Sequence, residues 1–175
     1  MKDKKKWMMT ATAAVGALIG RICYECRHFT TEYYDVASDK IPEAFEGFRF
    51  VVLSDLHNYD FDQGNRKLLR AIERLKPDAV MIAGDMIDAH PGADMSAAVR
   101  MVRDLCDRWP VYFGNGNHEQ RIALYSETYG DMHARWCKAI RHPNLHLLRN
   151  QHTVIRKDGA YINIYGLELN RTYYK

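Results

Sequence analysis

The sequence predicts an α/β protein in which a mixed β-sheet is layered with helices. Three short runs of β-forming residues are each followed by a polar loop and then by apolar residues at helical spacing. This rhythm is typical of parallel strands joined by helices. A second signal lies further along the chain, where Asp158-Gly159 separates two more β-prone runs and indicates a hairpin. Parallel strands combined with a hairpin give the mixed sheet that we expect.

The first three strands are expected at 48–53, 79–83 and 111–113. Each is a mostly apolar run, as in strands that are buried on both faces of a sheet. Helices are expected at about 68–75 and 95–109, because their apolar residues recur every three or four positions. Asp94 is placed to cap the second helix. We then expect a less regular helical region at about 120–140 and hairpin strands at 154–157 and 161–165.

The N-terminus predicts a membrane helix. Lys2 and Lys4 to Lys6 precede a mostly apolar stretch at 7–20, which Arg21 closes. This pattern indicates an uncleaved signal anchor or transmembrane helix at 1–24, although crossing a bilayer usually takes about 20 apolar residues. The positive-inside tendency places the lysines in the cytoplasm and the rest of the chain outside the cell membrane. A soluble amphipathic helix is the alternative.

Composition argues against one class of partner. Residues 2–6, four lysines and Asp3, account for the formal net charge of +3, because the rest of the chain holds 21 basic and 21 acidic side chains. A nucleic-acid-binding surface is therefore not expected, and whether the chain has a protein partner is unknown from the sequence. We expect a spacer at 25–47 and a globular domain at 48–175.

The four cysteines indicate no metal site. Cys23 and Cys26 have the spacing of a redox or zinc pair, but no second pair follows that would complete a zinc site. Cys106 is expected on the apolar face of the second helix, where cysteine acts as a small hydrophobe. The sequence indicates no role for Cys137.

Three polar clusters follow the three expected strands. The carboxyl ends of parallel strands meet at one edge of a sheet, so these clusters should converge. Asp55 and His57 lie two residues apart and point the same way in an extended strand exit. Asp85 follows the second strand and has two oxygens that can bridge two cations. Asn117 follows the third strand and offers a neutral oxygen ligand.

Taken singly, each cluster also fits a turn or a helix cap. The joint occurrence of the three clusters in this order is stronger evidence for a metal site. The pattern resembles that of the calcineurin-like metallophosphoesterase family. The matching motifs are Asp55-Leu56-His57, Gly84-Asp85-Met86-Ile87-Asp88 and Gly116-Asn117-His118-Glu119. The resemblance implies that this chain forms the first half of an α/β-β/α sandwich. The residues Ser54 to Asn58 and the lysine-rich N-terminus are further similar to a bacterial, membrane-attached branch of the family.

The resemblance also implies the roles of the site residues. Asp55 and His57 would hold a first metal, Asp85 would bridge, Asn117 would bind a second metal, and His118 would be the catalytic residue that faces the substrate. The implied reaction is hydrolysis of a phosphomonoester or phosphodiester, assisted by two divalent metal ions. Mixed oxygen and nitrogen ligands accept manganese, iron, zinc or similar ions.

Two more residues of the motifs are expected to support the ligands. Asp88 and Glu119 would orient the groups that bind the metals rather than bind them directly. His90 lies close to the second motif and is weighed as a substitute ligand, although histidine has many other roles.

The motifs stop short of the full family pattern. Two further histidine clusters that complete both metal shells are absent from the 175 residues, so we expect a C-terminally truncated chain whose second metal site binds poorly. The alternative function is a non-catalytic, membrane-anchored domain that binds a phosphate-bearing ligand or a protein partner.

Overall fold

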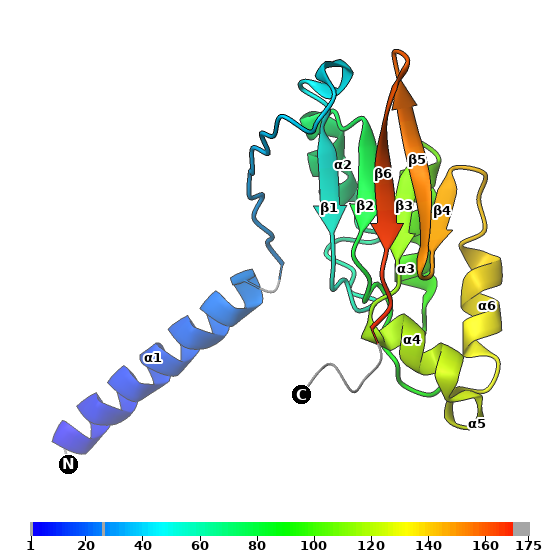
Figure 1. Cartoon of the computed structure of the whole chain (residues 1–175). Coiled ribbons are helices and arrows are strands. Elements are labelled where there is room, and N and C mark those ends of the chain that lie inside the picture. Colours follow the sequence, from blue (N-terminus) through cyan, green and yellow to red (C-terminus); the bar gives the residue numbers. More distant parts are fainter. Residues whose placement is uncertain (1, 26, 170–175) are drawn as a thin grey trace. The chain divides into compact units, whose positions relative to one another are not determined.

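The structure is a computed structural model that describes residues 2–25 and 27–169. The chain divides into two units, with the boundary between Asp35 and Val36. Figure 1 shows a helix in the first unit and an α/β arrangement in the second. The α/β class predicted from the sequence is therefore confirmed.

The first unit contains α1 (Lys2–Glu25), at the place where we expected a membrane helix. Within residues 2–25 and 27–169, we find no helix with the length and apolar character that crossing a membrane requires. In α1 the apolar stretch ends at Arg21, whose Nε lies 2.8 Å from Oε1 of Glu25. The membrane-spanning helix expected at 1–24 is thus not supported by the structure.

The second unit is built on a four-stranded parallel sheet, ordered β1-β2-β3-β4. Its strands are β1 (Phe50–Leu53), β2 (Ala79–Ile82), β3 (Val111–Gly114) and β4 (Leu145–Leu148). The first three were predicted. The fourth was missed because its Leu-His-Leu-Leu sequence lacks β-branched residues, so nothing in its composition favours a strand.

Five helices accompany this sheet: α2 (Arg66–Leu75), α3 (Ser96–Cys106), α4 (Asn117–Leu124), α5 (Ser126–Tyr129) and α6 (Met132–Ala139). The helical region expected at 120–140 is broken into three short helices. Tyr125 leaves the helical conformation, and Gly130 has a φ of 58°. The residue in the N-cap position of α3 is Met95 rather than the expected Asp94, although the Asp94 carboxylate accepts the backbone N–H of Ser96, the first residue of α3, at 2.9 Å.

One face of the sheet forms the main core with α2 and α3. Alternate residues of the central strands, such as Val80 and Ile82, pack against helix residues that include Ile72 and Met101. Phe113 and Trp136 are fully buried in the same cluster. Apolar burial on this scale is the main source of stability for such a unit.

The hairpin covers the opposite face. It consists of β5 (Gln151–Lys157) and β6 (Ala160–Gly166), joined at the predicted turn. It forms its own antiparallel sheet, so the expectation of one mixed sheet is wrong. Ile155, Ile162 and Ile164 share one side of the hairpin and pack with Tyr112 of β3, because stacking face to face buries them. Figure 1 shows β5 and β6 in front of the parallel strands, and α2 behind.

The same second core takes in part of the expected spacer. The 3-10 helix η1 (Glu43–Phe45) precedes β1, and Phe45 is buried against the sheet face under the hairpin. The packing of this unit therefore begins before residue 48.

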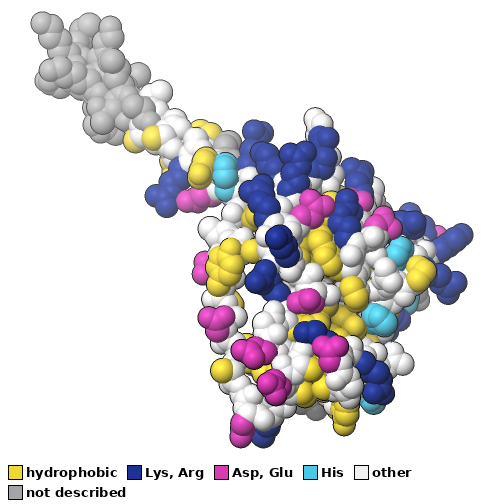
Figure 2. Space-filling view, turned by 90° about the horizontal axis from the view of Figure 1, so that it is seen from above, with side chains coloured by type: hydrophobic (Ala, Val, Ile, Leu, Met, Phe, Trp, Pro, Cys, Tyr) yellow, Lys and Arg dark blue, Asp and Glu magenta, His cyan; other side chains and the backbone are white. Residues whose placement is uncertain are grey.

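The two ends of the parallel sheet differ in character. Figure 2 views the molecule from above Figure 1, and Lys and Arg side chains gather on this face. Arg74 and Arg103 lie in the last turns of α2 and α3, where a cation stabilises the negative end of the helix dipole. Arg108 pairs with Glu73 at 2.9 Å. The motif residues lie at the other end, where β1, β2 and β3 all finish.

Candidate metal centre

Backbone hydrogen bonds lock the loop after β1 to the loop after β2. The N–H of Asp55 donates to the carbonyl of Gly84 at 3.2 Å, and the N–H of His57 donates to the carbonyl of Asp85 at 3.0 Å. The N–H of Asn58 donates to the carbonyl of Met86 at 2.9 Å. The pairing of the strands thus extends beyond their ends, which fixes the first motif beside the second.

The backbone of these motifs adopts an uncommon conformation. Asp55, His57, Asn58 and Asp85 have φ values of 56°, 48°, 58° and 53°, in the left-handed region that non-glycine residues rarely enter. Each costs on the order of 1 kcal/mol and persists only where the surroundings impose it. Such residues cluster at functional sites because they aim side chains that a regular strand would point elsewhere.

Glu119 joins the third motif to the second. Its side chain is 1% exposed, and its Oε2 accepts the N–H groups of Asp85 and Gly116, both at 2.9 Å. Its Oε1 accepts the N–H groups of Met86 at 2.9 Å and Ile87 at 3.3 Å. Burial raises the pKa of Glu119, while the backbone N–H donors oppose this effect. The carboxylate therefore ties four backbone groups of two loops to α4.

Two glycines permit this close approach. A Cβ on Gly84 would lie 2.1 Å from the backbone nitrogen of Gly116, and a Cβ on Gly116 would lie 2.4 Å from Oδ1 of Asp85. Both distances are too short for any side chain. Glycine is required at these positions because backbone packs directly on backbone.

Three of the predicted metal ligands converge. Asp55, His57 and Asp85 each offer a ligand atom, and these atoms all lie within 4.8 Å of one another. Nε2 of His57 is 3.6 Å from Oδ1 of Asp55, and Ser54 donates a hydrogen bond to the other oxygen of that carboxylate. The side chains of Asp55 and His57 are exposed, so an ion and its substrate can reach them.

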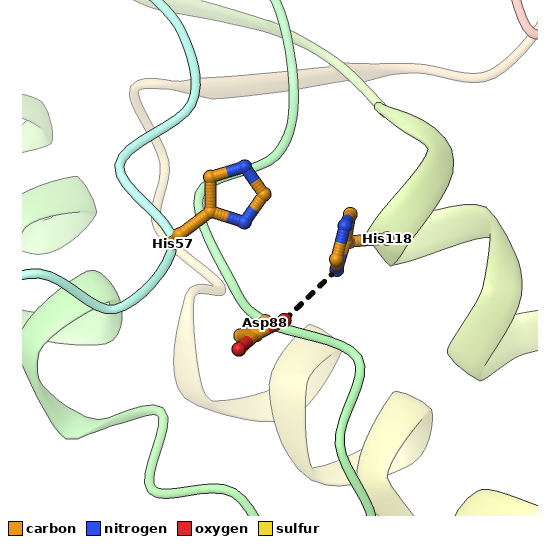
Figure 3. Close-up of side chains that lie close together, drawn as sticks. All are labelled: His57, Asp88 and His118. Atoms are coloured by element: carbon orange, nitrogen blue, oxygen red, sulfur yellow. Dashed lines mark ion pairs between the residues drawn. The ribbon is translucent and has the colours of Figure 1, made fainter.

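A second group shares His57 with the first. Ligand atoms of His57, Asp88 and His118 also lie within 4.8 Å of one another. Figure 3 shows both imidazole rings next to the Asp88 carboxylate, with a dashed line from Asp88 to His118 that spans 3.3 Å between Oδ1 and Nδ1. The two rings meet edge to face, with their centroids 4.6 Å apart. We had expected Asp88 to act only as a support, and the structure also makes it a candidate ligand.

The backbone fixes the tautomer of His118. The N–H of Ala89 donates to Nδ1 of His118 at 2.8 Å, so Nδ1 carries a lone pair and the proton of the neutral ring lies on Nε2. The backbone N–H of His118 donates to Oδ1 of Asp85 at 2.8 Å. His118 is thus held to the second motif through both its ring and its backbone.

Asn117 and His90 are the two remaining candidate ligands from the sequence. Asn117 is the first residue of α4 and is half-buried, and both of its neighbours, Gly116 and His118, approach Asp85. Nε2 of His90 is 3.5 Å from Oδ2 of Asp88, and its side chain is 76% exposed. His90 therefore faces solvent beside the second group of candidate ligands.

Comparison with known proteins agrees with this geometry. A sequence profile described as Calcineurin-like phosphoesterase matches residues 48–174. The chain is 30% identical over 122 residues to a protein of Danio rerio named "Transmembrane protein with metallophosphoesterase domain"; the match covers 68% of this chain and 28% of that protein. A protein of Bos taurus with the same name is 27% identical over 130 residues, which cover 73% of this chain and 27% of that protein.

A bacterial relative is similar to the same degree. The chain is 27% identical over 130 residues to an uncharacterized metallophosphoesterase of Campylobacter jejuni, covering 73% of this chain and 31% of that protein. The chain thus spans less than a third of the length of these relatives.

Gly84→Ala will lower the free energy of unfolding far more than Gly92→Ala. Both glycines have positive φ, 86° and 75°, so both substitutions carry a conformational cost of about 1–2 kcal/mol. Only at Gly84 does the added Cβ collide with backbone, and nothing lies within 4 Å of a Cβ on Gly92. We expect Gly84→Ala to lower the free energy of unfolding, measured by urea unfolding, by more than about 4 kcal/mol. Equal losses for the two variants would contradict the close contact between the loops.

Proposed function

Because this chain belongs to the calcineurin-like phosphoesterase family, we propose that it supplies the metal-binding motifs of a hydrolase of phosphomonoesters or phosphodiesters. The observation that carries the proposal is the convergence of Asp55, His57 and Asp85 from two separate loops. Carboxylate oxygens together with an imidazole nitrogen fit a divalent ion such as manganese, iron or zinc.

We assign the ligands to two neighbouring cations that share Asp85. The first would be held by Asp55, His57 and Asp85, and the second by Asp85 and Asn117. Support for this assignment comes from the contacts of Gly116 and His118 with Asp85, which bring the segment around Asn117 to the same carboxylate. When bound, the cations supply charge to neutralise the phosphate and to activate a water.

His118 is the catalytic residue of the proposal. With Nδ1 occupied by the N–H of Ala89, the neutral ring presents Nε2–H, which can donate a hydrogen bond to a phosphate oxygen. To protonate a leaving oxygen, the ring must first gain a second proton at Nδ1. That proton would face Oδ1 of Asp88, which lies 3.3 Å from Nδ1. The hydrogen bond from the N–H of Ala89 to Nδ1 would then be lost. Asp88 is thus placed to stabilise the charged ring.

Glu119 and Asp88 complete the proposal as supporting residues. Glu119 holds the loop that carries Asp85, and Asp88 lies beside His57 and His118. The alternative function, a non-catalytic domain that binds a phosphate-bearing ligand, would use the same charged residues without hydrolysis. A metal requirement and turnover distinguish the two functions.

Asp85→Asn will weaken Mn²⁺ binding more than Asn117→Ala, because Asp85 is the carboxylate shared by both proposed ions. We expect a loss of at least about tenfold in calorimetric titration for Asp85→Asn. Asp158→Asn is the matched control. Asp158 also has a left-handed φ, 49°, and lies in the hairpin turn away from the motifs.

Hydrolysis of a chromogenic phosphodiester and of a chromogenic phosphomonoester completes the test. Turnover that requires the metal and is lost in Asp85→Asn supports the enzyme. Binding of inorganic phosphate without metal, unchanged in Asp85→Asn, would favour the non-catalytic alternative. Equal or reversed effects of Asp85→Asn and Asn117→Ala on Mn²⁺ binding would refute the shared ligand.

We also propose that the chain associates with a membrane through α1. Two of its relatives are named transmembrane proteins. In α1 the side chains of Val15, Leu18, Ile19 and Ile22 are at least half exposed, and lysines precede them. Apolar side chains flanked by cations favour contact with lipid.

Flotation with vesicles of neutral and anionic lipid tests membrane association. The wild-type chain will float with the vesicles, and the double variant Leu18→Asp with Ile19→Asp will not, because charges on the apolar side of α1 oppose burial in lipid. Val36→Asp is the control at an exposed apolar residue outside α1. A wild-type chain that stays with the soluble fraction would overturn this part of the proposal.

A further inference from the structure

A cluster of polar and nucleophilic side chains lies outside the candidate metal centre. His133 and Cys137 are four residues apart on α6 and therefore share one side of the helix. Arg149 follows β4 directly and reaches both of them. None of the three belongs to the family motifs, and the sequence alone indicated no role for Cys137.

The three side chains form a close triangle. Nη2 of Arg149 lies 3.0 Å from Sγ of Cys137 and 2.9 Å from Nε2 of His133, and Sγ lies 3.4 Å from the same Nε2. Guanidinium nitrogens only donate, so both the sulfur and the imidazole nitrogen accept hydrogen bonds from Arg149. A cationic donor on sulfur stabilises the thiolate, which is the nucleophilic form of cysteine.

His133 helps to hold this arrangement. Burial and the neighbouring Arg149 both lower the pKa of His133, while Glu168 opposes them. The ring is therefore neutral near pH 7, and its Nε2 lone pair is free to accept from Arg149. The side chain of Glu168 in turn accepts a hydrogen bond from Nδ2 of Asn115 at 2.6 Å, which helps to position this carboxylate.

One hydrogen-bond donor of Arg149 lacks an acceptor among the described residues. Its Nε is buried and has no hydrogen-bond partner among residues 2–25 and 27–169. Nε and Nη2 lie on the same edge of the planar guanidinium, which is the edge that binds pairs of oxygens. An oxygen atom added to Sγ would give this buried donor the acceptor that it lacks, and an unpaired buried donor is destabilising.

We propose that Cys137 is a modification site that hydrogen peroxide oxidises to a sulfenic acid. The thiolate sulfur attacks one peroxide oxygen, so an S–O bond forms while the O–O bond breaks. Sulfur loses two electrons and the peroxide gains them. The leaving hydroxide takes a proton from solvent, which replaces the proton that the thiol released, and the products are the sulfenic acid and water.

Cys106 provides a comparison for Cys137 within the same chain. Cys106 is completely buried in the main core, and burial raises the pKa of its thiol to about 12. Cys137 is only half-buried and has a cationic donor on its sulfur. Hydrogen peroxide should therefore distinguish the two within one folded chain.

The test follows Cys137 by peptide mass spectrometry in the whole chain. Hydrogen peroxide is applied with dimedone, which traps sulfenic acids, and iodoacetamide at pH 6.5 measures the thiolate separately. We expect native Cys137 to react about tenfold faster with iodoacetamide than the same residue in urea, although it is less exposed when folded. The dimedone adduct should form at Cys137 and not at Cys106.

Substitutions of Arg149 test whether its guanidinium causes the reactivity of Cys137. Arg149→Gln should slow both reactions of Cys137 about tenfold, and Arg149→Lys, which keeps the positive charge, should retain most of the rate. Rates at native Cys137 that do not exceed those in urea overturn the proposal, whether or not the variants fold. Unchanged rates in a folded Arg149→Gln variant overturn it as well.

Discussion

The buried carboxylate of Glu119 is the interaction on which the candidate site depends. It accepts four backbone N–H groups, three of them from consecutive residues of the loop after β2. A loop that leaves a sheet has no regular partners, and unpaired buried N–H groups would each cost about 1–3 kcal/mol. One carboxylate on α4 satisfies them together. The loop is therefore fixed relative to α4, and Asp85 is fixed with it.

The strain of the motif backbone follows from this constraint. Asp85 is held in the left-handed region, and the loop after β1 is bonded to its carbonyl and to that of Met86. Asp55 and His57 adopt the same unusual conformation, and their side chains then face Asp85. Packing of Gly84 on Gly116 removes the space in which these loops could relax. Carboxylates that would repel one another are thereby kept together, which is the condition for binding a divalent ion.

Much of this arrangement could be predicted from the sequence, because strands and motifs depend on local patterns. The apolar runs before Asp55, Asp85 and Asn117 located three strands, and parallel pairing brings their ends together. Contacts between distant side chains could not be predicted. Nothing local indicates that Ile155 stacks its hairpin on the sheet, or that Arg149 reaches Cys137. The approach of Asp88 to His57 likewise arises from loop conformations that no residue pattern specifies.

Mn²⁺ binding by Glu119→Gln, followed by calorimetry, tests most directly whether this carboxylate organises the metal site. An amide can accept with one atom only, and its NH₂ group would face the remaining N–H donors. We expect the variant to stay folded by circular dichroism and to bind Mn²⁺ at least about tenfold more weakly than wild type. The control variant Glu127→Gln, at an exposed residue of α5, should bind Mn²⁺ as wild type does. A folded Glu119→Gln chain with wild-type Mn²⁺ affinity would contradict the central role of Glu119.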